Sequence, residues 1–117
     1  MNLKVISFNI RCANDENGHS IAERAPRLVK TTAPYDADVI GFQEYIPQWD
    51  EFTQKYYLEN YDMFLKYRAE ESSEGCPILW KKDKFECLDV LCAHDVWTCA
   101  KVYKLALTVK TYFLTLG

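Results

Sequence analysis

The feature that most constrains the fold is a strand–helix–strand pattern near the start of the chain. Residues 3–10 alternate between two faces, and Ile6, Phe8 and Ile10 share one of them, which predicts a strand with an apolar face. In residues 37–44, Val39, Ile40 and Phe42 form a nearly continuous apolar run, which favours a strand buried on both sides. Two such strands joined by a helix normally lie parallel in one sheet. The pattern therefore predicts an α/β fold.

The connecting helix has a clear start signal. Ser20 and Glu23 have the spacing of a capping box, in which each side chain bonds the backbone N–H of the other residue. This predicts a helix over residues 21–32. Pro26 interrupts the pattern and would also be compatible with a start near Ala25.

The rest of the chain continues as mixed secondary structure. The short charged turn at 81–84 favours an antiparallel hairpin between the strands on either side of it. With 117 residues, the chain has the length of a single domain. Further apolar patterns predict a helix over 47–57 and strands over 61–67, 77–80, 85–91 and 104–116, with an acidic loop at 69–75.

Charge and cysteine content exclude several classes of protein. Lysine and arginine total 14 against 17 acidic residues, a net charge of −3, which excludes a strongly basic nucleic-acid-binding coat. No apolar run approaches the roughly 18 residues of a membrane span, and the N-terminus lacks a signal-peptide core. The 5 cysteines are odd in number and form no CxxC pair, so a disulfide framework is not expected. We expect a cytoplasmic protein with no membrane partner.

Two polar residues stand where the first two predicted strands end. Asn9 closes the first strand and Glu44 closes the second. If these strands are neighbours, they lie about 5 Å apart, and ligands of open α/β sheets bind outside such strand ends. A carboxylate is a common Mg²⁺ ligand, and an amide can bind a phosphate oxygen. The plain alternative, which the spacing alone favours, is two polar residues at the edge of the core.

Longer stretches around these residues resemble a known family. Residues 5–11 (VISFNIR) and 38–44 (DVIGFQE) resemble the opening of the endonuclease/exonuclease/phosphatase family, which includes nucleases similar to DNase I and several phosphatases. Residues 77–86 (PILWKKDKFE) resemble the family's next hairpin, so the similarity covers residues 3–89. The resemblance implies a partial α/β sandwich in which a mixed β-sheet is flanked by helices.

The resemblance also implies a reaction and a set of roles. The implied activity is hydrolysis of phosphoester bonds that depends on Mg²⁺ or Mn²⁺, with nucleic acid or a small phosphorylated molecule as substrate. By the resemblance, Glu44 is the metal ligand, and Asn9 orients the phosphate or a metal-bound water. Gln43 supports the local geometry. Asn9 and Glu44 are thus the expected catalytic residues and the expected metal site.

The chain also departs from the family pattern. Family enzymes are much longer, and their second half carries a D-x-N motif and a late S-D-H motif that this sequence lacks. We interpret residues 90–117 as a divergent tail of a single truncated domain spanning residues 1–117. The expectation is an inactive or weakly active N-terminal fragment.

Two other interpretations stay open. One is a non-catalytic binding module that pairs with itself or with a complementary half through an uncovered sheet face, since half a sandwich leaves apolar surface exposed. The other is an ordinary α/β domain with unrelated ligands.

Several weaker candidates have simpler explanations. His19 could touch substrate but is expected to be a solvated loop residue, and Arg11 could reach a phosphate or form a surface salt bridge. An acidic run could supply a second metal ligand, but a solvated loop is the preferred interpretation. A zinc site in the tail fits none of the usual ligand spacings. The acidic residues are Glu70, Glu71 and Glu74, and the tail residues are Cys87, Cys92, His94 and Cys99.

Overall fold

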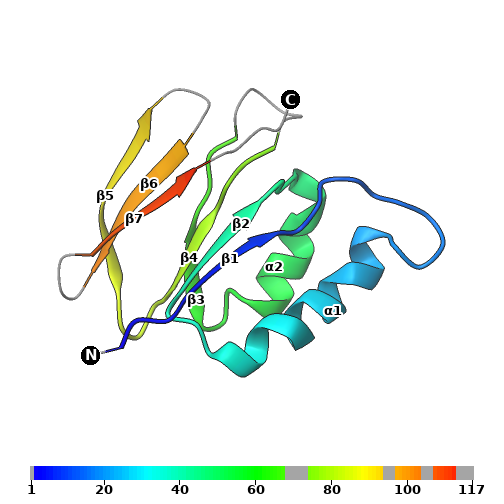
Figure 1. Cartoon of the computed structure of the whole chain (residues 1–117), viewed down its shortest axis with the longest axis horizontal. Coiled ribbons are helices and arrows are strands. Elements are labelled where there is room, and N and C mark those ends of the chain that lie inside the picture. Colours follow the sequence, from blue (N-terminus) through cyan, green and yellow to red (C-terminus); the bar gives the residue numbers. More distant parts are fainter. Residues whose placement is uncertain (1, 68–73, 94–96, 104–106, 113–117) are drawn as a thin grey trace.

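The computed structural model describes residues 2–67, 74–93, 97–103 and 107–112. It contains a four-stranded sheet in the order β1-β2-β4-β3 and a three-stranded sheet in the order β5-β6-β7. Helices α1 and α2 cover one face of the four-stranded sheet, and the three-stranded sheet lies on the opposite side (Figure 1). The elements are β1 (Val5–Asn9), α1 (Ile21–Thr32), η1 (Ala33–Tyr35), β2 (Val39–Gln43), η2 (Pro47–Trp49), α2 (Asp50–Tyr56), β3 (Tyr61–Phe64), β4 (Ile78–Lys81), β5 (Glu86–Ala93), β6 (Trp97–Tyr103) and β7 (Leu107–Tyr112).

The predicted strand–helix–strand unit is confirmed. β1 and β2 pair in parallel, and Asn9 lies opposite Gln43. α1 begins directly after Ser20, whose hydroxyl accepts from the Glu23 amide at 3.2 Å, while the Ser20 amide donates to the Glu23 carboxylate at 3.1 Å. Pro26 is accommodated inside the helix, so the later start is not observed.

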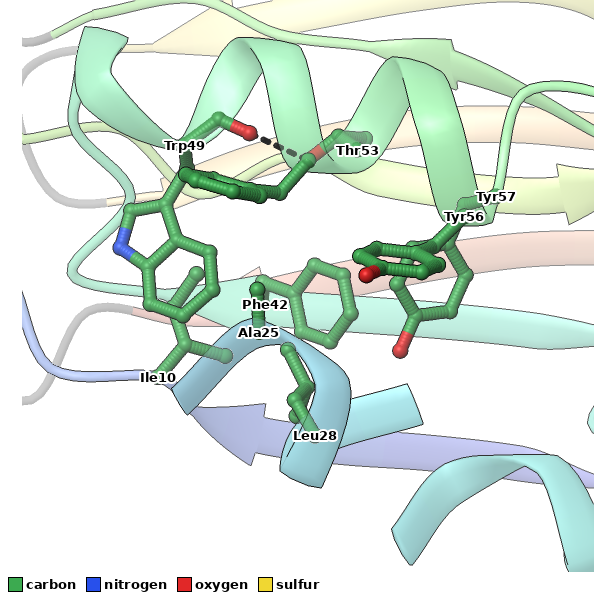
Figure 2. A pocket seen from close by; sticks show the side chains of 9 residues that line it. Ile10, Ala25, Leu28, Phe42, Trp49, Thr53, Tyr56 and Tyr57 are labelled. Carbon is green, nitrogen blue, oxygen red and sulfur yellow. Dashed lines mark hydrogen bonds between the residues drawn. The ribbon is translucent and has the colours of Figure 1, made fainter. Parts of the chain in front are cut away.

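The main core fills the space between the helices and the four-stranded sheet. Ile40 and Phe42 of β2 are almost fully buried on this side. Figure 2 shows the aromatic and aliphatic side chains that surround Phe42, and these leave essentially no room for a water molecule. The surrounding residues are Ile10, Ala25, Leu28, Trp49, Phe52, Thr53, Tyr56 and Tyr57. Across the described residues, no helix is long and apolar enough to span a bilayer.

The opposite face of the same sheet is covered only in part. Val39, Ile78 and Trp80 form a second buried cluster. Because Val39 alternates along β2 with Ile40 of the main core, this cluster lies on the face turned away from the helices. Val5, which lies opposite Val39 in the register, is 53% exposed on the outer strand β1. Among the residues whose burial is described, the uncovered apolar surface of this face therefore lies at β1.

One expectation about strand pairing is wrong. The hairpin between residues 77–80 and 85–91 does not form, because β4 already has β2 on one side and β3 on the other. With both of its edges occupied, β4 offers no place for β5, which pairs instead with β6 in the second sheet. β6 was not predicted, whereas β7 lies within the strand predicted over 104–116.

The remaining expectations for this part of the chain agree more closely. The second helix begins as the 3₁₀ turn η2 before α2 follows, and β3 is shorter than the strand predicted over 61–67. The division of the chain at residue 89 stays a prediction.

A buried carboxylate ties the strands together at the amino end of β2. Asp38 is 5% exposed and accepts from the Lys4 amide at 3.0 Å and from the Lys84 ammonium at 3.2 Å, with the Lys81 ammonium at 3.7 Å. Burial by itself would raise the pKa of Asp38, but these hydrogen bonds and positive charges outweigh it and lower the pKa. The charge at this end of the strand is therefore compensated within the protein.

Candidate functional site

The parallel pairing brings the two predicted site residues into contact at the carboxyl end of the sheet. Asn9 is the last residue of β1, and Glu44 follows β2 directly. The Asn9 Nδ2 group donates to Glu44 Oε1 at 2.9 Å. Gln43 points elsewhere: its amide nitrogen donates to the Ser7 hydroxyl at 3.0 Å and to the Gly41 carbonyl at 3.2 Å, which braces β1 against β2.

The loop that follows β1 fixes both side chains. The Arg11 amide donates to Asn9 Oδ1 at 2.9 Å, so the amide nitrogen of Asn9 must face Glu44. The Cys12 amide donates to Glu44 Oε2 at 3.1 Å. Both carboxylate oxygens of Glu44 thus accept hydrogen bonds from neutral donors.

Two residues of the site have a left-handed backbone. Glu44 has a φ of 58° and Arg11 a φ of 64°. For residues with a Cβ this conformation costs about 1–2 kcal/mol, and it persists where the surrounding structure enforces it, often at functional sites. Here the hydrogen bonds among Asn9, Arg11, Cys12 and Glu44 provide that enforcement.

A third segment adds a second carboxylate. Tyr45 and Gly75 exchange two backbone hydrogen bonds, of 3.1 and 2.7 Å, which place Glu74 beside Glu44. Ligand atoms of Cys12, Glu44 and Glu74 lie within 4.8 Å of one another. Glu74 is half-buried, so the interpretation of its segment as a solvated loop is wrong at this position. Glu70 and Glu71 lie outside the described residues.

The electrostatics of the cluster favour a cation. The hydrogen bond from Asn9, followed by that from the Cys12 amide, lowers the pKa of Glu44 and keeps it ionised. Burial, then hydrogen bonding and repulsion from Glu74 and Glu44, raises the pKa of the Cys12 thiol to about 11. In the described part of the chain, no lysine or arginine forms an ion pair with Glu44, because Arg11 pairs with Asp15 at 2.7 Å.

The donor set of the cluster fits a divalent metal ion. Mg²⁺ is commonly held through one or two carboxylates together with water and substrate oxygens. Glu44 and Glu74 supply two carboxylates from different segments, and Asn9 holds the first of them in place. Within the described residues, this is the one group of three histidine, cysteine or acidic side chains close enough to share an ion.

A groove with basic walls lies beside Asn9. Its volume is about 300 Å³, and Arg11, Arg24, Arg27 and Trp49 contribute to its lining. The Arg24 guanidinium donates to the carbonyls of Arg11 and Ala13 at 2.9 and 2.7 Å and lies 5.7 Å from the centre of the Trp49 ring. These contacts hold the loop that carries Cys12.

The weaker candidates can now be placed. His19 is an exposed residue that lines a separate open hollow together with Arg11 and Arg24. Two roles were expected for Arg11, a phosphate contact or a surface salt bridge. The structure shows a salt bridge with Asp15. The candidate zinc site of the tail includes His94, which lies outside the described residues.

Sequence reasoning missed Cys12 as a member of the site. It also assigned Glu74 to solvent, although one signal was available for it. An antiparallel neighbour of β2 must begin near the place where β2 ends, so the residues just before β4 approach Glu44. Cys12 carries no such signal, because it lies in a loop without regular structure.

Comparison with solved structures identifies this architecture. An endonuclease/exonuclease/phosphatase family protein from Bacteroides thetaiotaomicron superimposes with a TM-score of 0.69, covering 92% of this chain and 48% of that chain at 21% identity. This chain has the endonuclease/exonuclease/phosphatase fold. No protein-family model and no curated protein matches the sequence.

Two further solved structures share this fold. For the Bacteroides thetaiotaomicron mannosyl-6-phosphatase the TM-score is 0.71 at 21% identity, with 93% of this chain and 49% of that chain covered. For D. rerio TDP2 in complex with a single-strand DNA product it is 0.68 at 23% identity, with 92% and 43% covered. The chain therefore spans about half the length of the structures it matches.

Proposed function

We propose that this chain carries part of the active site of a Mg²⁺- or Mn²⁺-dependent phosphoesterase. The observation that carries the proposal is the contact between Asn9 and Glu44 at the carboxyl end of two parallel strands, with Glu74 beside them. The bound ion would supply Lewis-acid stabilisation of charge on a phosphoryl oxygen. The fold shared with phosphatases and with TDP2 supports the same reaction class.

The roles of the residues follow from their contacts. Glu44 offers a charged oxygen to the ion, and Glu74 offers a second one from the other side of the cluster. Asn9 holds Glu44 through one amide hydrogen and has a second hydrogen to donate to a phosphate oxygen. Asn9 and Glu44 are therefore the proposed catalytic residues.

The groove suggests how a phosphorylated substrate would approach. Arg11, Arg24 and Arg27 bring positive charge to the wall next to Asn9, in a protein whose net charge is −3. Arginine recognises phosphate through charge-assisted hydrogen bonds. One solved structure with this fold is a sugar phosphatase and another holds a DNA product, so the proposed substrate is nucleic acid or a small phosphorylated molecule.

We further propose that the 117-residue chain by itself has little or no turnover. Among the described side chains, the hydrogen-bond partners of Glu44 are Asn9 and Cys12, and neither is a general base for water. Loss of one member of a catalytic group commonly reduces the rate by orders of magnitude. The chain should therefore bind the ion without efficient hydrolysis.

The test combines binding and activity. Purified chain is titrated with Mg²⁺ by calorimetry and then assayed on a chromogenic phosphodiester and on single-stranded DNA. The proposal expects ion binding that disappears in Glu44→Ala, together with hydrolysis near background. Mg²⁺-dependent hydrolysis that vanishes in Glu44→Ala would overturn the claim of low activity, and binding unaffected by Glu44→Ala would overturn the metal site.

A second candidate function rests on the outer strand of the sheet. β1 is an edge strand of the four-stranded sheet. Three apolar residues on or beside it are partly exposed: Leu3 at 37%, Val5 at 53% and Phe8 at 36%. An open strand edge with apolar side chains is a template for adding another strand. The proposed role is a binding module that pairs with a second copy or a complementary half through β1.

Sedimentation at increasing concentration tests this second candidate. A dimer of defined mass that Val5→Lys dissociates would support it, and Tyr35→Lys is a control because Tyr35 is 62% exposed outside the sheet. A monomer at every concentration, or aggregates without defined mass, would count against self-pairing.

A further inference from the structure

The indole N–H of Trp49 is a buried donor without an acceptor. Trp49 is 2% exposed, and its Nε1 atom has no hydrogen-bond partner among the described residues. The same holds for the Nε atom of Arg24, whose guanidinium lies 5.7 Å from the centre of the Trp49 ring. Native proteins rarely leave a buried donor unpaired, so each such donor calls for an explanation. Here two of them belong to neighbouring side chains.

Both side chains line the groove beside Asn9. Its volume of about 300 Å³ is within the range of small-molecule sites. Trp49 also lines the space around Phe42 in the core, but Figure 2 shows its indole nitrogen on the side of the ring turned away from Phe42. The unpaired donor therefore does not face the core, and the groove is another hollow that Trp49 lines.

The groove also carries positive charge without a negative partner. The guanidinium groups of Arg24 and Arg27 donate to backbone carbonyls, which have no net charge. In the described part of the chain, neither forms an ion pair with an acidic side chain. None of the described residues that line the groove is acidic. The groove therefore combines unpaired donors with uncompensated positive charge, a combination that suits an anion with several acceptor oxygens.

We infer that this groove binds a phosphate group of the ligand other than the one that reacts at the metal centre. The buried N–H groups of Trp49 and Arg24 donate to its oxygens, and the exposed Arg27 contributes charge. A phosphate suits the groove better than a carboxylate does, because a phosphate monoester has a charge of about −1.5 to −2 at pH 7 and three strong acceptor oxygens.

The groove is distinct from the metal centre. Cys12, Glu44 and Glu74 are not among the residues that line it, whereas Asn9 lines it and also bonds Glu44 at 2.9 Å. What the groove means for the substrate rests on the proposed function: when the reacting phosphate lies beside Glu44, the groove takes a second one. The substrate class is then a phosphate ester with at least two phosphate groups.

Apolar surface lies next to the arginines of the groove. Phe8, Ile10 and Leu28 contribute to its lining, and Phe8 is 36% exposed. The organic part of a ligand that joins two phosphates can rest against these side chains. A suitable probe therefore carries a phosphate and an apolar ring, as phenyl phosphate does.

The test follows the indole N–H signals of the tryptophans by ¹H–¹⁵N NMR, with EDTA present so that no metal ion contributes. The full chain is titrated with phenyl phosphate and, separately, with benzoate, which keeps the ring but carries a carboxylate. Trp80 is an internal control, because its Nε1 atom is also buried without a described partner but Trp80 does not line the groove. Arg27→Gln is compared with Lys30→Gln, which removes a charge from an exposed position of the same helix outside the groove.

We expect phenyl phosphate to move the Trp49 signal in a saturable manner and to leave the Trp80 signal in place. Arg27→Gln should weaken binding about two- to fivefold, which is the usual size of one exposed charge contact, whereas Lys30→Gln should leave it unchanged. Benzoate should bind more weakly than phenyl phosphate. The Trp49 shift should persist in Glu44→Gln, because the groove does not depend on the metal centre.

The other outcomes separate the groove from the metal centre. A Trp49 signal that does not move overturns the inference without affecting the proposed metal site. A Trp49 shift in a chain that binds no Mg²⁺ supports the groove and contradicts the proposed metal site. Equal shifts at Trp49 and Trp80, or equal weakening by Arg27→Gln and Lys30→Gln, indicate general attraction to positive charge and overturn the site. Benzoate that binds as tightly as phenyl phosphate overturns the assignment to phosphate.

Discussion

Strand β2 has a carboxylate at each end, and the two differ in the groups that surround them. Asp38 at the amino end is buried and lies within 4 Å of the ammonium groups of Lys81 and Lys84, at 3.7 and 3.2 Å. Glu44 at the carboxyl end is half-buried and is held by the neutral groups of Asn9 and Cys12. The pKa of each carboxyl is lowered, but for Asp38 two lysine ammonium groups within 4 Å contribute, whereas for Glu44 the largest causes are hydrogen bonds from Asn9 and from the Cys12 amide.

The difference separates a structural charge from one that is available to a ligand. Asp38 joins the segment before β1, its own strand and the region after β4, so its removal should disturb the fold. Glu44 lies with Glu74 and Cys12 in one cluster and is held by neutral donors, so its removal should disturb ion binding. Each of the following predictions tests this contrast.

The largest effect on stability is expected for Asp38→Asn. Removing one partner of a buried charge network leaves the others without compensation, which typically costs about 3–5 kcal/mol. Glu44→Gln should change the free energy of unfolding by no more than about 1 kcal/mol, because glutamine can still accept from Asn9. Urea denaturation of both variants measures the difference, and equal losses would contradict the contrast.

Low pH should remove part of the stability that ionised Asp38 contributes. The pKa of Asp38 is below its ordinary value of 3.8, so its contribution to stability is complete above that pH and is lost as the pH falls through the lower folded-state pKa. Urea midpoints between pH 6 and pH 3 should therefore fall more steeply for the parent protein than for Asp38→Asn. Identical slopes in the two proteins would contradict this assignment.

A smaller loss is expected for Gly75→Ala. A Cβ at this position would lie 2.7 Å from Leu65 Cδ1 and 3.0 Å from the Lys66 carbonyl oxygen. Such overpacking typically costs about 1–3 kcal/mol. Because Gly75 holds Glu74 against the end of β2, the variant should also bind Mn²⁺ more weakly, and calorimetry with unchanged affinity would show that Glu74 does not depend on this bridge.

The smallest effect is expected for Asp36→Asn. Asp36 contacts the Lys81 ammonium at 2.8 Å, but its side chain is 75% exposed, and solvent screens such pairs. The urea midpoint should stay within experimental error of the parent protein. A clear loss would mean that Lys81 is held for Asp38 by Asp36 and that the amino-end network is larger than described.

The sequence predicted those parts of the molecule that depend on local pattern. The alternation in β1, the capping box at Ser20 and the apolar run of β2 each depend on neighbouring residues, and together they placed Asn9 near Glu44. The pairing of β5 was wrong because it depends on which edges of β4 are already occupied, a property of the whole sheet.

The site was predicted less completely than the strands that carry it. Cys12 and Glu74 come from segments without regular periodicity, and their meeting depends on a loop held by Arg24 and on a bridge through Gly75. Neither interaction shows up as a periodic pattern of apolar residues. The two residues at strand ends could be predicted and Cys12 could not, whereas the one signal for Glu74 was its place just before the strand that pairs with β2.

The most direct test of the available charge at Glu44 is a Mn²⁺ titration followed by electron paramagnetic resonance, in which bound Mn²⁺ loses the sharp signal of the free ion. The measurement compares the parent protein, Glu44→Gln and Asp36→Asn, which removes an exposed carboxylate from the opposite end of β2. We predict that the parent protein and Asp36→Asn bind one Mn²⁺ and that Glu44→Gln does not. Equal binding by all three proteins would contradict the assignment of the cation site to the carboxyl end of the strand.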